Sequence, residues 1–235
     1  MNKSVALLTA ALLIAAGPAL AQDKAKAAQR VQNTLLENDK VRVYESISKP
    51  GEVSGSAVRP YRLVRVLQGG TSFRTYDDGK TQTVEYKTGD VFSVGPDKPY
   101  AAKNIGKTTI VLYVVNPKQA TGTAKVALTE KKPQASKAEP GKANLQVLFE
   151  NDALRAYEVR FKPGDESANI ERPYRIVRAL QGGTIQRTYP DGKTEKREWK
   201  TGEVRAEGPD KKFSGKNVGK TEIVLYGVEP KQAKK

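Results

Sequence analysis

Residues 59–70 read RPYRLVRVLQGG, and residues 172–183 read RPYRIVRALQGG. The similarity continues on both sides of this stretch without a gap, and residues 35–120 agree with residues 148–233 at more than half of their positions. The repeat is too long for a solenoid unit of roughly 20 to 50 residues, so each copy should be a complete domain. We therefore expect a tandem duplication of one small domain.

The composition limits the class of protein. The chain has 235 residues, a formal net charge of +15, no cysteine and no histidine. Without cysteine there is no disulfide, so the apolar cores of the two domains must supply the stability. The positive charge indicates an acidic partner, although a solvated lysine-rich surface explains it equally well.

The first 21 residues have the layout of a secretory signal peptide. Lys3 precedes an apolar run at residues 5–16, then a Gly17-Pro18 break and small residues up to Ala21. The run is shorter than the roughly 20 residues of a membrane helix, so we expect no transmembrane segment. Cleavage before Gln22 would release a periplasmic or secreted protein. In that compartment we expect no nucleic-acid partner, and instead an anionic small molecule or an acidic envelope polymer.

Each copy alternates short β-branched and aromatic stretches with turn motifs. Residues 61–67 read as a strand that ends at Gly69-Gly70, and Asp78-Gly79 is a hairpin signal because this pair tolerates positive φ. Turn signals at intervals of roughly 8–12 residues, with no helical period between them, favour an antiparallel sandwich or barrel. The predicted division is a signal peptide at 1–21, a tail at 22–34, a first domain at 35–120, a linker at 121–142 and a second domain at 143–233.

Six short motifs follow one another in the first copy: KPG at 49–51, LQGG at 67–70, DGK at 78–80, TGDV at 88–91, GPD at 95–97 and NIGK at 104–107. Their order and spacing resemble those of the cupins, a superfamily of small double-stranded β-helix barrels. The resemblance covers nearly all of both copies. It implies an all-β bicupin, with two jelly-roll-like cupin barrels in tandem joined by a linker.

Cupins with catalytic activity usually hold a divalent metal through histidines and a glutamate. The resemblance places these ligands at Ala57, Arg59, Leu63 and Tyr100 in the first copy and at Ile170, Arg172, Ile176 and Phe213 in the second. None of these residues is a histidine or a carboxylate, and neither arginine nor an aliphatic side chain ligates a metal. We therefore expect no metal and no cofactor.

Arginines and tyrosines near the vacant metal positions are the candidate anion-binding residues. If the cupin register holds, strand alternation turns them into the barrels: Arg59, Tyr61, Arg65 and Arg74 in the first copy, and Arg172, Tyr174, Arg178 and Arg187 in the second. Their charge needs a partner, because burying an unpaired guanidinium costs several kcal/mol. That partner is either a bound anion or an internal carboxylate such as Glu45 or Glu85, which recur as Glu158 and Glu198. Alternatively, the register is shifted by one residue, so that these arginines point into solvent and the opposite face, with Arg62, is the inner one.

These observations favour a binding or structural module over an enzyme. The alternative is a metal-independent isomerase, epimerase or lyase-like enzyme acting on a carbohydrate or carboxylic acid, but the histidine base of such cupins is missing. We expect Tyr44, Tyr113 and Trp199 to serve core or inter-barrel packing. The two barrels can cover each other within one chain, so either a monomer or a homodimer is compatible with the repeat.

Overall fold

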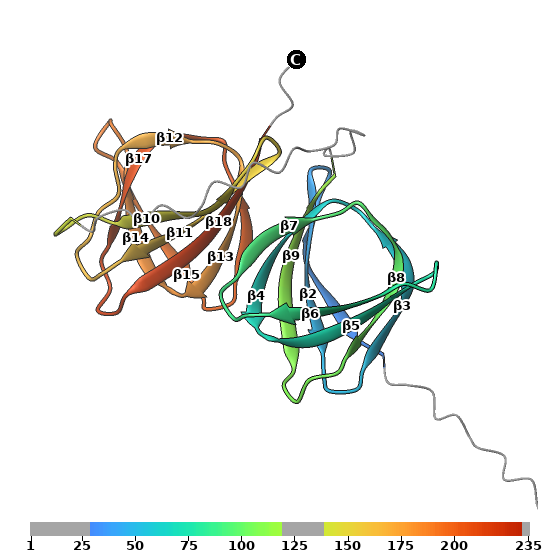
Figure 1. Cartoon of the computed structure of the whole chain (residues 1–235). Helices are drawn as coiled ribbons and strands as arrows, with labels where there is room; N and C mark the ends of the chain where they lie inside the picture. The colour runs from blue at the N-terminus through green and yellow to red at the C-terminus, as the bar shows by residue number, and fades with distance from the viewer. Residues whose placement is uncertain (1–28, 119–138, 232–235) are drawn as a thin grey trace, which may run out of the picture.

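The computed structural model describes residues 29–118 and 139–231, and the regular elements in these ranges are all β-strands. The all-β prediction is therefore confirmed. Two barrels lie side by side, each built from one copy of the repeat (Figure 1). The predicted signal peptide, residues 22–28 of the predicted tail and most of the predicted linker fall outside the described residues. Within the described ranges no helix is long and apolar enough to cross a membrane.

The first barrel consists of a five-stranded sheet in the order β1-β2-β9-β4-β7 and a four-stranded sheet in the order β3-β8-β5-β6. Every pairing between its strands is antiparallel. The strands are β1 Val31–Glu37, β2 Val41–Ser48, β3 Val53–Arg59, β4 Arg62–Gln68, β5 Gly70–Tyr76, β6 Thr81–Tyr86, β7 Val91–Val94, β8 Asp97–Asn104 and β9 Ile110–Pro117.

The second barrel repeats this topology, with sheets in the orders β10-β11-β18-β13-β16 and β12-β17-β14-β15. Its strands are β10 Asn144–Glu150, β11 Leu154–Phe161, β12 Ile170–Arg172, β13 Arg175–Gln181, β14 Gly183–Thr188, β15 Thr194–Trp199, β16 Val204–Glu207, β17 Asp210–Asn217 and β18 Ile223–Pro230.

Register and turns agree between the barrels. Arg62 on β4 pairs with Val94 on β7, and the equivalent pair in the second barrel is Arg175 on β13 with Glu207 on β16. The predicted Asp-Gly hairpin connects β5 to β6, and its glycine, Gly79, has a φ of 81°. A residue with a side chain rarely adopts this φ, which is why glycine ends the turn. Equivalent side chains of the two copies can therefore be compared directly.

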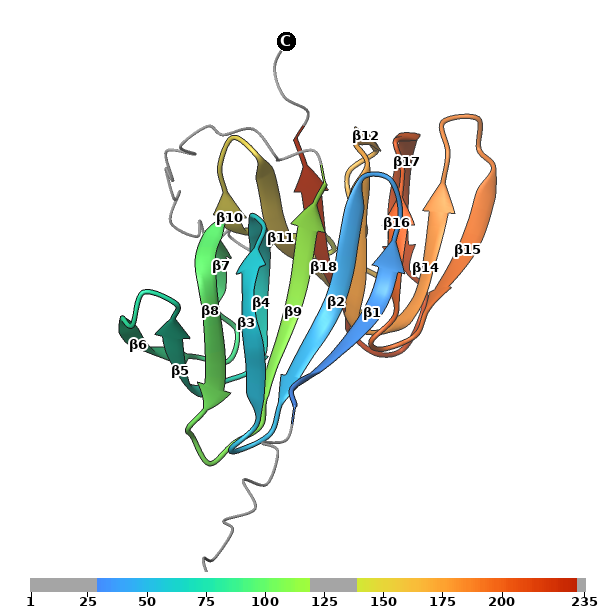
Figure 2. The same cartoon turned by 90° about the vertical axis from the view of Figure 1, so that its right-hand side faces the viewer.

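The first barrel begins earlier than predicted. Residues 22–34 were expected to form a tail, but β1 starts at Val31 and lies beside β2 as the edge strand of its sheet (Figure 2). The amide of Arg30 also donates a hydrogen bond of 2.9 Å to the carbonyl of Val53. The prediction was wrong because most β1 side chains are exposed and show no apolar alternation. Backbone pairing with β2 is the main support of the strand, and Leu36 adds a contact with the inter-barrel core. As a result, Arg30 becomes part of the barrel.

One apolar core joins the two barrels. It contains side chains of both copies: Val41, Val43, Tyr61, Leu63, Tyr113 and Val115 from the first, and Phe149, Leu154, Ala156, Ile176, Tyr226 and Val228 from the second. The rings of Tyr113 and Tyr226 meet edge to face, with centroids 5.9 Å apart. Core or inter-barrel packing was predicted for Tyr113 and is confirmed, since its ring packs between the barrels. Each five-stranded sheet thus has one face toward its own barrel and the other toward its neighbour.

Candidate functional site

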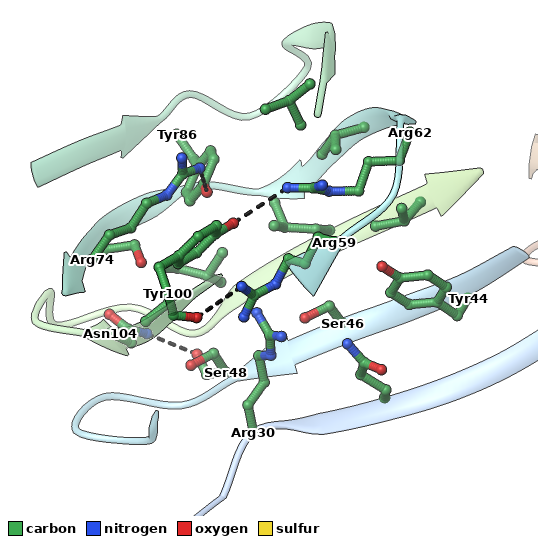
Figure 3. Close-up of a pocket in the computed structure, with 18 of the residues that line it drawn as sticks. Arg30, Tyr44, Ser46, Ser48, Arg59, Arg62, Arg74, Tyr86, Tyr100 and Asn104 are labelled. Atoms are coloured by element: carbon green, nitrogen blue, oxygen red, sulfur yellow. Dashed lines mark hydrogen bonds between the residues drawn. The ribbon is translucent and has the colours of Figure 1, made fainter. Parts of the chain in front are cut away.

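A small cavity lies inside the first barrel and holds about 50 Å³ of free space. Four arginines line it, namely Arg30, Arg59, Arg62 and Arg74 (Figure 3). They come from the segment before β1, from β3, from β4 and from β5. Strands of both sheets therefore place positively charged side chains around one cavity.

Arg62 is the neutralised member of this set. It is 5% exposed, and its Nη2 donates hydrogen bonds to the Asp97 carboxylate at 2.7 Å and to the Tyr100 hydroxyl at 3.2 Å. Its Nη1 donates to the carbonyl of Pro60 at 3.0 Å. An arginine held by a carboxylate and two further oxygens needs no external anion.

Arg59 and Arg74 flank the ring of Tyr100, with guanidinium carbons 3.9 Å and 4.8 Å from its centroid (Figure 3). Arg59 donates to the backbone carbonyl of Tyr100 at 2.8 Å and to the Ser54 hydroxyl at 3.1 Å. These neutral acceptors and the ring face satisfy the donors of Arg59. They leave its positive charge unbalanced, because no carboxylate is among them.

Arg74 is only partly satisfied. It is 7% exposed, and its Nη2 donates to the Tyr86 hydroxyl at 3.1 Å. Its Nη1 reaches Gln82 Oε1 only at 3.5 Å, and its buried Nε has no hydrogen-bond partner among the described residues. A buried donor without an acceptor costs about 1–3 kcal/mol, and more when it belongs to a charged group.

Arg30 adds a fourth cation from outside the predicted domain. Burial lowers its pKa, and the positive charge of Arg59 lowers it further. In the described ranges, residues 29–118 and 139–231, no carboxylate lies within ion-pair distance of Arg30, Arg59 or Arg74. Four guanidinium groups against the one carboxylate of Asp97 leave an excess of three positive charges at the cavity.

In the second barrel, apolar side chains occupy several positions that are polar around the cavity of the first. Five polar residues that line the cavity of the first barrel are replaced by apolar ones at the equivalent positions: Arg30, Gln32, Ser46, Ser48 and Ser72 by Ala143, Leu145, Val159, Phe161 and Ile185. Phe161 and Ile185 pack with Trp199 and Ile223 in one buried cluster. The duplicated barrels have therefore diverged at the positions that would contact a ligand.

A glycine of the second barrel makes room for a further aromatic ring. Gly227 on β18 stands where the first barrel has Val114 on β9. A Cβ at position 227 would collide with the ring of Tyr157, so the glycine lets this ring lie against the strand. Burial raises the pKa of the Tyr157 hydroxyl, as does the neighbouring carboxylate of Glu229.

The arginines of the second barrel have internal carboxylates. Arg187 donates to Glu207 at 2.6 Å, and both side chains are less than 10% exposed. Arg175 pairs with Asp210 at 2.8 Å. Arg172 is held by the carbonyl of Phe213 at 2.7 Å, and burial, together with the charge of Arg175, lowers its pKa to about 10.

Four of the predicted anion-binding residues lie between the barrels. Arg65 pairs with Glu158 at 2.7 Å, and Arg178 pairs with Glu45 at 2.6 Å. The hydroxyl of Tyr61 accepts a hydrogen bond from Asn151 at 2.8 Å, and that of Tyr174 accepts one from Asn38 at 2.9 Å. The prediction that these four residues face the barrel interiors is wrong, because β4 and β13 turn that face toward the other barrel.

The alternatives for the arginine partners are resolved differently at different positions. Glu45 and Glu158 are confirmed as internal partners, each for an arginine of the other copy. Glu85 and Glu198 form no ion pair within the part of the chain that the structure describes. The alternative of a shifted register is right that the face with Arg62 is the inner one, since Arg62 lines the cavity. It is wrong that the other arginines point into solvent, since Arg65 and Arg178 are nearly buried between the barrels.

Arg59, Arg74, Arg172 and Arg187 do lie inside their barrels, as predicted. Sequence reasoning missed Arg30 and Arg62 in the first barrel. A position-by-position comparison of the copies contains a signal for the site, because the first copy alone is polar at Gln32, Ser46, Ser48 and Ser72.

The residues at the usual metal positions of a cupin do not fit a metal ion. Of the first copy, Arg59 and Tyr100 line the cavity, while Leu63 lies in the inter-barrel core. The excess of guanidinium groups would repel a divalent cation. The described residues also contain no group of three or more histidine, cysteine, aspartate or glutamate side chains placed to hold one.

With two such barrels in tandem, the chain has the fold of the cupin superfamily and the architecture of a bicupin. A cupin 2 conserved barrel domain protein from Leptotrichia buccalis is 16% identical, with a TM-score of 0.52 over 88% of this chain and 91% of that one. A mutant of oxalate decarboxylase from Bacillus subtilis is 10% identical, with a TM-score of 0.59 over 88% of this chain and 75% of that one. No protein-family model and no curated protein matches the sequence.

Proposed function

We propose that this protein is a metal-free, non-catalytic bicupin whose first barrel binds a small anion. The observation that carries the proposal is the excess of three positive charges around one cavity. Buried guanidinium groups without counter-charge are costly, and a carboxylate or an inorganic oxyanion would satisfy them through charge-assisted hydrogen bonds.

The size of the cavity limits the ligand. A space of about 50 Å³ has room for only a few water molecules. This favours an anion of a few non-hydrogen atoms over a chain of an acidic envelope polymer. The filled interior of the second barrel supports a stoichiometry of one anion per chain.

The test is thermal unfolding of the purified protein with sodium acetate, formate, sulfate and phosphate at constant ionic strength. A ligand that binds only the native state raises the unfolding midpoint. We expect a rise with at least one anion, and its loss in Arg74→Gln and in Arg30→Gln. Arg42→Gln is the matched control, since it removes one positive charge from an exposed pair on β2 and should leave the response intact. No response to any anion in the wild-type protein would refute the proposal.

Export is part of the proposal, supported by the layout of residues 1–21. We expect the mature protein to begin at Gln22 and to occur in the periplasm or the medium of a bacterial host. Mass spectrometry of the mature N-terminus after fractionation is the test, and an uncleaved chain in the cytoplasm would contradict it.

One observation favours a second candidate, a metal-independent enzyme acting on a small carboxylic acid or carbohydrate. The hydroxyl of Tyr100 lies in the cavity beside Arg62, at 3.2 Å, where it could donate a proton to a bound substrate. The oxalate decarboxylase with the same fold acts on a carboxylic acid, as its name states. Tyr100→Phe separates the candidates, because a binding module retains its ligand response, whereas an enzyme loses turnover.

A further inference from the structure

The two barrels differ at one position that bears directly on the ligand. Val94 pairs with Arg62 across the sheet of the first barrel, and Glu207 pairs with Arg175 at the equivalent position of the second. Glu207 accepts a hydrogen bond from Arg187 at 2.6 Å, while Arg74, the counterpart of Arg187, has no carboxylate. The second barrel thus has a carboxylate side chain where the first has a short aliphatic one.

Arg74 and Arg187 occupy equivalent places. Arg74 pairs with Gln82 and Ala102 across the neighbouring strands, and Arg187 pairs with Glu195 and Gly215 in the same register. The guanidinium of Arg74 lies 4.8 Å from the ring centroid of Tyr100. That of Arg187 lies 4.5 Å from the ring centroid of Phe213. The two arginines therefore face the same space from the same direction.

In the first barrel this space belongs to the cavity, whereas in the second barrel the buried Glu207 side chain lies beside Arg187. Val94 lines the cavity, and its side chain ends before the carboxyl group of a glutamate would begin. The Nε of Arg74 is buried and unpartnered among the described residues, and Arg74 itself is 7% exposed. In the second barrel the Glu207 side chain is 8% exposed, so a carboxylate is accommodated there within the barrel.

We propose that the anion of the first barrel is a small carboxylate whose carboxyl group pairs with Arg74, in the position that Glu207 occupies beside Arg187. The inference rests on the proposed function, that the first barrel binds a small anion, and it adds the chemical class and the position of the ligand. It also explains the second barrel as a copy in which a side chain has replaced the ligand.

The two copies supply the variants that test this, because their natural residues can be exchanged. Val94→Glu places a carboxylate beside Arg74, and Val94→Gln is its matched neutral control. We expect Val94→Glu to lose the rise in unfolding midpoint produced by sodium acetate and sodium formate. Without ligand, its midpoint should lie above that of Val94→Gln.

The reverse exchange, Glu207→Val, opens the equivalent space in the second barrel. We expect a lower unfolding midpoint that acetate or formate partly restores. Glu207→Gln keeps the space filled and should not be restored. Measuring both in the Arg74→Gln background confines the response to the second barrel.

A carboxylate response in the wild-type protein that Val94→Glu abolishes supports the proposal, as does restoration of Glu207→Val by acetate. If Val94→Glu responds to acetate like the wild-type protein, the position is wrong. If sulfate or phosphate stabilises the wild-type protein and acetate and formate do not, the carboxylate assignment is overturned while the proposed function stands. If no anion stabilises the wild-type protein, both fail for the first barrel, whatever Glu207→Val does.

Discussion

Arg65 of the first barrel donates a hydrogen bond of 2.7 Å to Glu158 of the second, and both side chains are nearly buried. Arg178 and Glu45 repeat this contact in the opposite direction at 2.6 Å. The guanidinium of Arg65 also lies over the ring of Tyr226, 4.6 Å from its centroid. The duplicated arginines therefore hold the barrels together through a pseudo-twofold pair of contacts.

Arg65→Ala should destabilise the protein without affecting anion binding. Glu158 keeps a second ion pair with the half-exposed Arg160, so the loss should be smaller than the about 3–5 kcal/mol typical of leaving a buried charge without any partner. Urea unfolding measures the loss, and Arg42→Ala, at an exposed pair, should cost no more than about 1 kcal/mol. If Arg65→Ala instead abolished the anion response and left stability unchanged, Arg65 would belong to a binding site.

The hydroxyl groups of Tyr113 and Tyr226 should be dispensable. Both are buried without a hydrogen-bond partner among the described residues, and burial raises the pKa of each above its ordinary value of 10. Tyr226→Phe keeps the edge-to-face ring contact, so we expect stability to change by less than about 1 kcal/mol or to rise.

A matched substitution at the same interface should behave differently. Tyr61→Phe removes the acceptor of the 2.8 Å hydrogen bond from Asn151 and should cost about 1 kcal/mol or more. Chemical denaturation of both variants makes the comparison. A larger loss for Tyr226→Phe than for Tyr61→Phe would mean that the Tyr226 hydroxyl has a partner, such as a buried water.

The same change, arginine to glutamine, should affect the free energy of unfolding differently at the equivalent positions 74 and 187. Arg187→Gln leaves the buried Glu207 without its cation, and we expect a loss of about 3–5 kcal/mol. Arg74→Gln removes a cation that has no carboxylate partner in the described chain, so stability without ligand should change by less than about 1 kcal/mol or increase. Urea unfolding in an anion-free buffer tests this, and equal losses would contradict the charge imbalance of the first barrel.

Acid should remove a contribution of Glu203. A hydrogen bond of 2.9 Å from the amide of Lys200 holds the pKa of this carboxyl below its usual 4.5, and the guanidinium of Arg205 lowers it further. Because the folded-state pKa is depressed, the stabilisation is present above pH 4.5 and is lost as the pH falls through the lower folded value.

Glu203→Gln should therefore flatten the decline in unfolding free energy below pH 4.5. The control is Glu171→Gln, at an exposed position of β12, which should leave the curve unchanged. Thermal unfolding between pH 3 and pH 7, roughly the range over which carboxyl groups titrate, makes the measurement. A curve for Glu203→Gln that coincides with the wild-type curve would show that the carboxyl contributes nothing at acid pH.

The sequence alone determined the architecture of this protein. The repeat established two equivalent domains, and the Asp-Gly hairpins and Gly-Pro breaks marked the ends of strands, because these features depend on local backbone conformation. Comparison of the copies also shows where polar residues such as Ser46 and Ser48 gave way to Val159 and Phe161. This information lies in the chain itself and needs no knowledge of contacts.

Only the tertiary structure decided which face of β4 forms the site. Strand alternation separates Tyr61 and Arg65 from Arg62 and Val64, but both faces are buried and both carry arginine. One face packs against the second barrel and the other lines the cavity. The alternation of polar and apolar residues therefore cannot show which face is the inner one. The place of Arg30 depended on the same cause, since an edge strand held by backbone hydrogen bonds leaves no apolar pattern in the sequence.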